Sequence, residues 1–160
     1  MKRRLAIVIA TFGGAGLFPI AAGTVGSAAF LAIYAAIVFA GASASTLLAV
    51  QLVGTAALFV VGVWACSEVE SIYGKDGGEM VVDEAMGMLI SLILIPPTLV
   101  NMGAAFLLFR AFDIVKPWPA GACEKLPKGW GVMLDDLVAG IYANVVLRLA
   151  LIAWAAFARA

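Results

Sequence analysis

The chain has 160 residues, of which 64% are hydrophobic and only 12% are charged, with a mean hydropathy of +1.10. Soluble domains are nearer half apolar and a quarter charged, and a chain this short cannot hide so much apolar surface from water. The composition therefore excludes an ordinary cytosolic protein, a disordered chain and a secreted disulfide scaffold. It predicts a single membrane-embedded domain over residues 1–160.

Charge balance and residue usage exclude further classes. Ten basic and ten acidic residues cancel, so nothing indicates a nucleic-acid partner. The chain contains no histidine, which excludes Ser-His-Asp hydrolysis, H-E-x-x-H zinc sites and a phosphohistidine intermediate. The two cysteines, Cys66 and Cys123, form no C-x-x-C pair, and we expect two reduced thiols.

The apolar stretches, taken in chain order, predict an all-α protein with about four to five membrane-embedded helices. A short apolar run at 5–12 is broken by the glycines that follow it and by Pro19. The stretch 27–42 predicts a first helix, and 47–66 predicts a second with about the 20 residues that a bilayer requires. Residues 137–157 are the last predicted helix.

The segment 85–109 is apolar but contains Pro96 and Pro97. A single kinked span would carry the chain to the opposite face, whereas a turn at the prolines returns it to the side it left. Two successive prolines disfavour a continuous helix, although each half has only about 12 residues, or roughly 18 Å, which is short for a span. We therefore expect a short hairpin buried within the protein.

The basic residues predict the orientation. In the hairpin topology one face carries most of them, namely Lys2, Arg3, Arg4, Lys75, Arg110, Lys116, Lys125 and Lys128. The positive-inside rule makes this face cytoplasmic.

Acidic residues gather at predicted helix ends on that same face. Asp83 and Glu84 open the hairpin, Asp113 follows it, and Asp135 and Asp136 open the last helix. Acids at helix N-termini commonly only cap the helix and complement its dipole. Five clustered carboxylates, however, repel one another unless a cation binds them, and hard oxygen ligands suit Mg²⁺.

The predicted roles follow from these positions. The predicted metal ligands are Asp83, Glu84, Asp135 and Asp136, with Glu79 as a further member and Asp113 as a ligand or the general base. Four other acids are expected to be solvated, namely Glu68, Glu70, Asp76 and Glu124. The residues Asn144 and Arg148 lie deep in the last predicted helix, where ionisable groups are often functional, and their roles stay open.

Basic and hydroxyl side chains predict a phosphate site beside the metal. Arg110 and Lys116 flank Asp113, and their guanidinium and ammonium groups suit a phosphate, although alone they are typical of interfacial anchors. Residues 22–27 predict a glycine-rich turn before a helix, with the candidate anion contacts Gly23, Thr24, Gly26 and Ser27. No G-K-[ST] follows, so this is not a Walker A loop.

Four segments together resemble the signature blocks of the phosphatidylglycerophosphatase A family. They are Ala22-Gly-Thr-Val-Gly-Ser27, Asp83-Glu-Ala-Met-Gly87, Arg110-Ala-Phe-Asp-Ile-Val-Lys-Pro-Trp-Pro119 and Gly129-Trp-Gly-Val-Met-Leu-Asp-Asp-Leu-Val-Ala-Gly140. Their order and spacing match over about residues 11–144, with Ala22 where the family usually has proline. The resemblance implies a multihelical, Mg²⁺-dependent enzyme of the bacterial inner membrane with a cytoplasm-facing site. It implies removal of the terminal phosphate of the membrane phospholipid phosphatidylglycerophosphate to give phosphatidylglycerol and inorganic phosphate.

Other phosphatase chemistries fit the sequence poorly. Ile72 stands where a cysteine phosphatase has the arginine of C-x5-R, and Asp113-Ile-Val lacks the second aspartate of D-x-D. We therefore expect attack by a metal-activated water, with Lys116 or a second metal stabilising the leaving oxygen. The alternatives are another Mg²⁺-dependent lipid-phosphate phosphatase or transferase, and a non-enzymatic divalent-cation transporter. The sequence predicts no oligomeric state.

Overall fold

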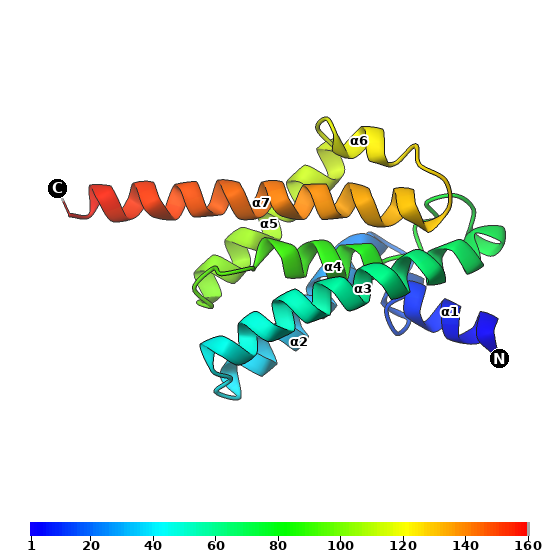
Figure 1. Ribbon diagram of the computed structural model, residues 1–160, viewed down its shortest axis with the longest axis horizontal. Helices are drawn as coiled ribbons and strands as arrows, with labels where there is room; N and C mark the ends of the chain where they lie inside the picture. The colour runs from blue at the N-terminus through cyan, green and yellow to red at the C-terminus, as the bar shows by residue number, and fades with distance from the viewer. Residues whose placement is uncertain (160) are drawn as a thin grey trace.

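The computed structural model describes residues 1–159, which form helices and turns without a β-strand in that range (Figure 1). This confirms the predicted all-α class. The elements in chain order are α1 (Lys2–Ala10), a 3₁₀ turn η1 (Ala15–Leu17), α2 (Ala22–Phe39), α3 (Ala44–Tyr73), α4 (Val82–Ser91), α5 (Leu99–Val115), α6 (Ala120–Cys123) and α7 (Gly129–Phe157).

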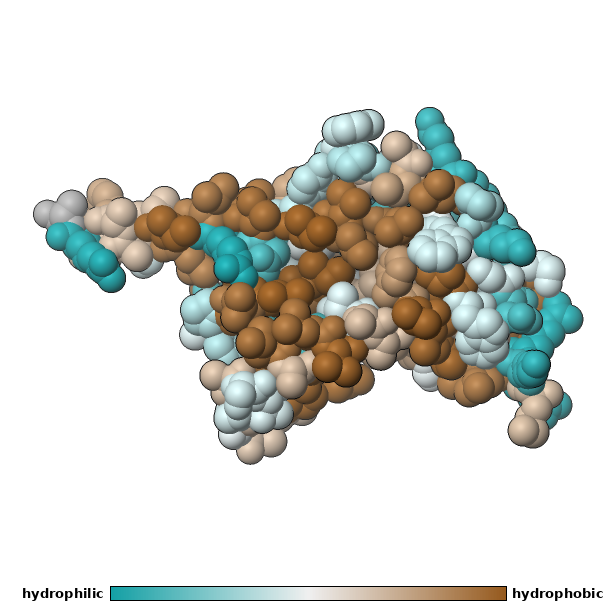
Figure 2. Space-filling model, in the orientation of Figure 1, coloured by the Kyte–Doolittle hydropathy of each residue, from teal (hydrophilic) through white to brown (hydrophobic). Residues whose placement is uncertain are grey.

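Three of these helices, α2, α3 and α7, are long and apolar enough to cross a membrane, with 18, 30 and 29 residues. Large apolar side chains such as Val53, Leu149 and Ile152 are exposed along them. In Figure 2 apolar residues cover much of the middle of the molecule, and hydrophilic residues gather at the end formed by α1 and the loops before α4 and α7. The protein therefore has the surface of an integral membrane protein, as its composition predicts.

The spanning helices extend beyond the predicted apolar stretches. The first begins at Ala22 rather than at residue 27, the second continues to Tyr73, and the last begins at Gly129 rather than at residue 137. Hydropathy marks only the part of a helix that matches the hydrocarbon layer, whereas the hydrogen-bonded backbone continues through small and polar residues outside it. These extra turns carry residues of the predicted site.

The predicted break at Pro96 and Pro97 is confirmed. It lies between α4 and α5, which form an antiparallel hairpin, and α4 lies between α3 and α7 in Figure 1. Of the ten residues of α4, all except Glu84 are buried. Both hydrophobic clusters of the protein include residues of α4, so this short helix is the centre of the core.

The C-terminal end of α4 lies inside the protein, where its last carbonyl groups need partners. The Asn144 side-chain amide donates to the carbonyls of Ile90, Ser91 and Ile93 at 3.3, 3.1 and 2.9 Å. Arg148 donates through Nη2 to the same Ile93 carbonyl at 2.6 Å and through Nε to Asn144 Oδ1 at 2.7 Å. These contacts show that Asn144 and Arg148 cap the short helix.

On the other side of α4, Gln51 of α3 completes this cap. Its amide nitrogen Nε2 donates to the Leu92 carbonyl at 2.8 Å, and its Oε1 accepts from the Leu94 backbone N–H at 3.2 Å. The Tyr34 hydroxyl of α2 also accepts from Gln51 Nε2 at 2.8 Å. Side chains of α3 and α7 therefore replace the water that would otherwise solvate the end of α4, and Tyr34 of α2 bonds to one of them.

Two glycines set how closely α4 approaches α7. A Cβ atom at Gly140 would lie 2.6 Å from the Gly87 carbonyl oxygen, and one at Gly87 would lie 2.8 Å from the Asp136 carbonyl oxygen. Small residues at a helix crossing allow the two backbones to meet, as is common between membrane helices. This contact brings the N-terminal part of α4 against the second turn of α7, where the acidic residues lie.

Candidate active site

Three carboxylates from two helices meet at this crossing. Asp83 and Glu84 lie in the first turn of α4, and Asp136 lies in the second turn of α7. One oxygen atom from each of the three side chains lies within 4.8 Å of the others. Asp83 is 5% exposed and Asp136 is 1% exposed, so two of the three are almost completely removed from solvent.

These buried carboxylates are not satisfied by the protein. Within residues 1–159, Asp83 Oδ1, Glu84 Oε2 and Asp136 Oδ2 have no hydrogen-bond partner, although each atom is buried. A buried polar atom without a partner costs free energy, and buried like charges repel unless an opposite charge lies between them. The unpartnered oxygens therefore fit a divalent cation, since hard oxygen ligands are the ones such ions prefer.

The electrostatics of α4 agree with that fit. Burial raises the pKa of Asp83 well above its ordinary value, and the neighbouring charge of Glu84 raises it further. Burial also raises the pKa of Glu84, where the charge of Asp113 adds to the increase and that of Arg110 opposes it. Without a cation these groups resist ionisation, because each charge lies in a region of low dielectric beside another acid.

Arg110 connects this cluster to α2. Its Nη1 lies 2.8 Å from Asp113 Oδ2 and 3.9 Å from Glu84 Oε1, and it donates to Ser27 Oγ at 3.4 Å. The Nε atom is buried and has no partner within residues 1–159. A guanidinium group held beside a carboxylate cluster, with one donor still free, is suited to an oxyanion such as phosphate.

The predicted glycine-rich turn at residues 22–27 is wrong, because this segment forms the first turns of α2. Ser27 Oγ donates back to the Gly23 carbonyl at 2.9 Å, as hydroxyls in helices commonly do. A Cβ atom at Gly23 would collide with the Glu84 carboxylate, and one at Gly26 would lie 2.8 Å from Val81 Cβ. Both glycines therefore serve the close approach of α2 to the site.

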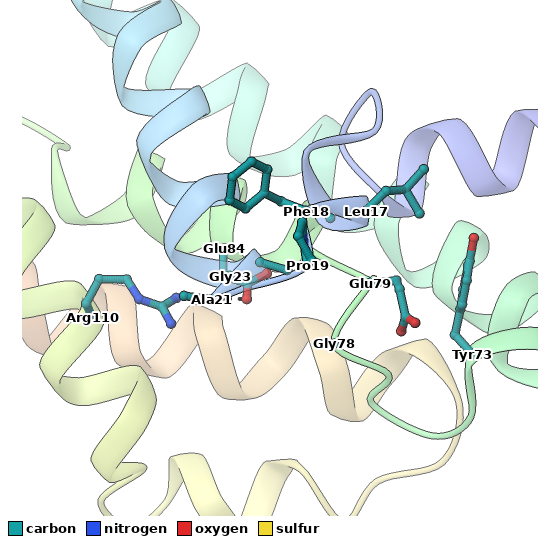
Figure 3. A pocket seen from close by; sticks show the side chains of 12 residues that line it. Leu17, Phe18, Pro19, Ala21, Gly23, Tyr73, Gly78, Glu79, Glu84 and Arg110 are labelled. Carbon is teal, nitrogen blue, oxygen red and sulfur yellow. Dashed lines mark ion pairs between the residues drawn. The ribbon is translucent and has the colours of Figure 1, made fainter.

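A pocket of about 620 Å³ opens beside Arg110 and Glu84. Figure 3 shows these two residues at one end of the pocket and Glu79 with Tyr73 at the other. The lining includes the loop around η1 and the start of α2, namely Gly16, Leu17, Phe18, Pro19, Ala21, Ala22 and Gly23. The structure therefore places Glu79 in the pocket wall, whereas the carboxylate cluster that could hold a cation consists of Asp83, Glu84 and Asp136.

Lys116 and Asp135 form a separate ion-pair network. Lys116 ends α5 with a left-handed backbone, and its Nζ lies 2.7 Å from Asp135 Oδ2. It also lies 3.5 Å from both Asp76 and Glu124, which the sequence predicts as solvated. Burial alone lowers the pKa of Lys116, but the hydrogen bond to Asp135 and the three acidic charges raise it above its ordinary value.

Sequence reasoning missed the pairing of Asp76 and Glu124 with Lys116, because no local pattern joins residues so far apart in the chain. It also missed the role of Tyr73 and of residues 16–19 in the pocket wall. The glycines at 13, 14 and 16 were a signal for an irregular loop, and Gly16 packs with its Cα against the backbone of Glu79. The predicted contact residue Thr24 lies in the first turn of α2 beside the pocket residue Gly23.

Together, the fold and the site define a helical membrane protein that gathers carboxylates and a guanidinium in one pocket at the polar end of its helices. The particular family follows from comparison with known proteins. The chain matches the family model described as phosphatidylglycerophosphatase A over residues 8–151, and it belongs to this family. It is therefore a phosphatase, which excludes the cation transporter left open by the sequence.

Individual relatives agree with this family. A putative phosphatidylinositol-3-phosphatase of Bacteroides thetaiotaomicron is 38% identical, over 94% of this chain and 97% of that protein. The phosphatidylglycerophosphatase A of Haemophilus influenzae is 40% identical, over 84% of this chain and 81% of that protein. The phosphatidylglycerophosphatase A of Escherichia coli is 34% identical, over 84% of this chain and 76% of that protein. No solved structure matches the chain at a significant level.

Proposed function

We propose that the protein hydrolyses the terminal phosphate monoester of phosphatidylglycerophosphate to give phosphatidylglycerol and inorganic phosphate, with Mg²⁺ as its cofactor. The observation that carries this proposal is the set of unpartnered, buried oxygens of Asp83, Glu84 and Asp136 beside Arg110. Such a set fits a cation that in turn contacts a phosphate. The names of the Haemophilus influenzae and Escherichia coli relatives support the choice of lipid.

Each residue of the proposed site has a separate role in the reaction. When bound, Mg²⁺ supplies positive charge that neutralises the phosphoryl oxygens and lowers the pKa of water. Asp83, Glu84 and Asp136 hold the cation, and Arg110 orients the phosphate and stabilises the charge that develops on it. Asp113, held by Arg110 at 2.8 Å, would take a proton from the attacking water as the new phosphorus–oxygen bond forms. It would give this proton to the glycerol oxygen as the bond between that oxygen and phosphorus breaks.

Asp135 and Lys116 complete the proposed site next to this cluster. Their ion pair at 2.7 Å holds Asp135, which directly precedes Asp136 in α7. Asp135 Oδ1 in turn accepts a hydrogen bond from the Asp136 backbone N–H at 2.9 Å. A direct role of Asp135 as ligand and of Lys116 as phosphate contact stays a prediction. So do the contacts of Thr24 with substrate and of Glu79 with the cation.

We also propose that the site faces the cytoplasm from the bacterial inner membrane. The support is the positive-inside rule, because eight of the ten Lys and Arg residues lie on the predicted cytoplasmic face and the other two are Arg148 and Arg159. Lys75 and Lys125 belong to two different loops at that end, and Lys75 Nζ donates to the Lys125 carbonyl at 3.4 Å. The substrate would then enter from the leaflet in which its phosphate is exposed to the cytoplasm.

The decisive experiment measures phosphate release by the purified protein in detergent micelles, with and without added Mg²⁺. Phosphatidylglycerophosphate, phosphatidylinositol 3-phosphate and phosphatidic acid are compared, because the Bacteroides thetaiotaomicron relative bears the name of an inositol-lipid phosphatase. We expect the fastest release from phosphatidylglycerophosphate and a loss of activity on chelation. Faster release from the inositol lipid would overturn the assigned substrate, and full activity in chelator would overturn the assigned cofactor.

A matched pair of variants tests the residues. Asp136→Asn preserves the side-chain volume and removes one ligand charge, so we expect catalytic efficiency to fall by about 10²- to 10³-fold, as for loss of one transition-state contact. Glu68→Gln makes the same kind of change on the exposed surface of α3 and is expected to leave activity unchanged. A folded Asp136→Asn protein with normal activity would contradict the proposed ligand set.

A further inference from the structure

A second hollow of about 380 Å³ lies between α2 and α5 and is almost entirely apolar. It is lined by Ala28, Leu31, Ala32 and Ala35 of α2 and by Leu99, Met102, Gly103 and Phe106 of α5. This hollow, here called the α2–α5 groove, exists because α2 packs mainly on α4 and α5 packs mainly on α7, which leaves an open seam between them. The seam is wide because most of the side chains of α2 that face it are small and because Gly103 has no side chain.

The α2–α5 groove lies next to the catalytic pocket along the same two helices. The pocket is lined by Gly23 of α2 and Arg110 of α5, and the groove begins about one turn further along the same two helices. On α5, Arg110, Phe106 and Gly103 follow one another at helical spacing and so share one face. The hydrogen bond from Arg110 to Ser27 joins the two helices where the polar pocket ends and the apolar groove begins.

We propose that the α2–α5 groove binds an acyl chain of the lipid whose phosphate is hydrolysed. This inference rests on the proposed function. It assigns the polar pocket to the phosphorylated head group and the groove to the hydrocarbon, in the order in which the two parts occur in a phospholipid. Along α2 the groove runs from Ala28 to Ala35, or about 10 Å at 1.5 Å per residue. In Figure 1, α2 runs from the loop after α1 toward its turn with α3, so the groove extends away from the catalytic pocket.

The occupant is assigned by chemistry and by position. The groove offers no charged side chain, so it suits hydrocarbon rather than a polar ligand or a peptide. Another apolar hollow of about 340 Å³ lies beside α1 and α3, with Ala57 and Val61 in its lining. That hollow lies outside the α2–α5 seam, so ordinary membrane lipid can fill it without contact with Arg110. The two hollows therefore form a natural comparison.

The test compares two substrates that share one head group. One is phosphatidylglycerophosphate with two oleoyl chains, and the other is its deacylated, water-soluble form. Gly103→Leu places a large side chain in the groove, and a Cβ atom at this position meets nothing within 4 Å, so the fold tolerates the change. Ala32→Leu obstructs the facing helix as a second variant, and Ala57→Leu fills the other hollow as the matched control.

We expect Gly103→Leu and Ala32→Leu to raise KM for the dioleoyl substrate about tenfold, equal to about 1.4 kcal/mol. For the deacylated substrate KM should not change, and Ala57→Leu should change neither. Equal effects on both substrates, or no effect of either groove variant, would overturn the assignment of the groove. A wild-type protein that releases phosphate from neither substrate would overturn the proposed function itself, and this inference with it.

Discussion

Arg110 is the residue at which the different parts of the site meet. It contacts an acid of α4, an acid of its own helix and a hydroxyl of α2, and it is only 15% exposed. One side chain therefore connects three helices beside the pocket, and its buried Nε has no partner within residues 1–159. Lysine at this position would preserve the charge but would lose the planar group that makes several contacts at once.

We predict that Arg110→Lys lowers the catalytic efficiency of phosphate release by about 10²-fold, the size of one lost oxyanion contact. Arg3→Lys is the matched control, because Arg3 lies outside the site and donates to the exposed Ser71 hydroxyl at 3.2 Å. Steady-state kinetics with a lipid phosphate measures both variants. Wild-type efficiency in Arg110→Lys would mean that a single ammonium group suffices and that the guanidinium geometry has no part in catalysis.

The Lys116–Asp135 pair gives a second prediction at this scale. Asp135 is 3% exposed, so Lys116→Met leaves a buried charge without its nearest partner and should lower the free energy of unfolding by about 3 kcal/mol. Addition of Asp135→Asn removes that stranded charge, so the double variant should recover most of the loss. Chemical unfolding in detergent measures the difference. A Lys116→Met protein as stable as wild type would contradict the prediction.

The same pair tests a role that the sequence predicts. If Lys116 and Asp135 only stabilise each other, activity toward lipid phosphate should return together with stability in the double variant. A stable double variant that stays inactive would support direct contact of at least one of the two side chains with the cation or the phosphate. The residue types in the sequence indicated which groups can bind a cation or a phosphate, but the choice of partners depends on tertiary packing between residues 19 or more positions apart.

Among the elements, α4 shows best what could be predicted from sequence. Pro96 and Pro97 remove backbone donors and restrict the preceding residue, so a break in the apolar segment followed from local chemistry. The start of α2 could not be predicted in the same way. Glycine disfavours a helix by about 1 kcal/mol relative to alanine, yet Gly23 and Gly26 are helical because packing against Glu84 and Val81 requires their small size.

Alanine substitution should have opposite effects on stability at Gly140, which lies in the crossing of α4 and α7, and at Gly103, which lies outside it. Gly140→Ala should destabilise the protein, because its Cβ atom would lie 2.6 Å from the Gly87 carbonyl oxygen and would separate Asp83 from Asp136. Gly103→Ala has open space, so the better helix propensity of alanine should stabilise it by up to about 1 kcal/mol. Thermal unfolding in one detergent compares them. Equal effects at both sites would contradict a close helix crossing.

At the scale of the whole molecule, the loops at one end bring together residues that the chain separates widely. The loop that follows α3 and the segment between α6 and α7 meet through Lys75 and Lys125. This arrangement requires the α4–α5 hairpin to return to the side it left. The composition predicted a membrane protein and the prolines predicted the hairpin, but only the folded chain shows that α4 is surrounded by α2, α3, α5 and α7.

The corresponding prediction concerns topology. In a variant without Cys66 and Cys123, single cysteines introduced at positions 75 and 125 should react with an impermeant maleimide from the same, cytoplasmic side. A cysteine at Ser43, in the turn between α2 and α3, should react from the opposite side. Labelling of intact cells and of inverted vesicles distinguishes the two faces. Reaction of positions 75 and 125 from different faces would contradict the hairpin and the single site.

The internal end of α4 has a consequence for how the protein is made. A helix of ten residues is about 15 Å long, too short for the insertion machinery to treat as a span, and its terminal carbonyls are unpaired until other helices reach them. Gln51 is synthesised before α4, but Asn144 and Arg148 are synthesised about 50 residues after it. We therefore expect the hairpin to wait at the bilayer surface during translation. It would enter the membrane only when α7 has been inserted and can cap it. The last step of biogenesis would then also bring the carboxylates of α4 and α7 together.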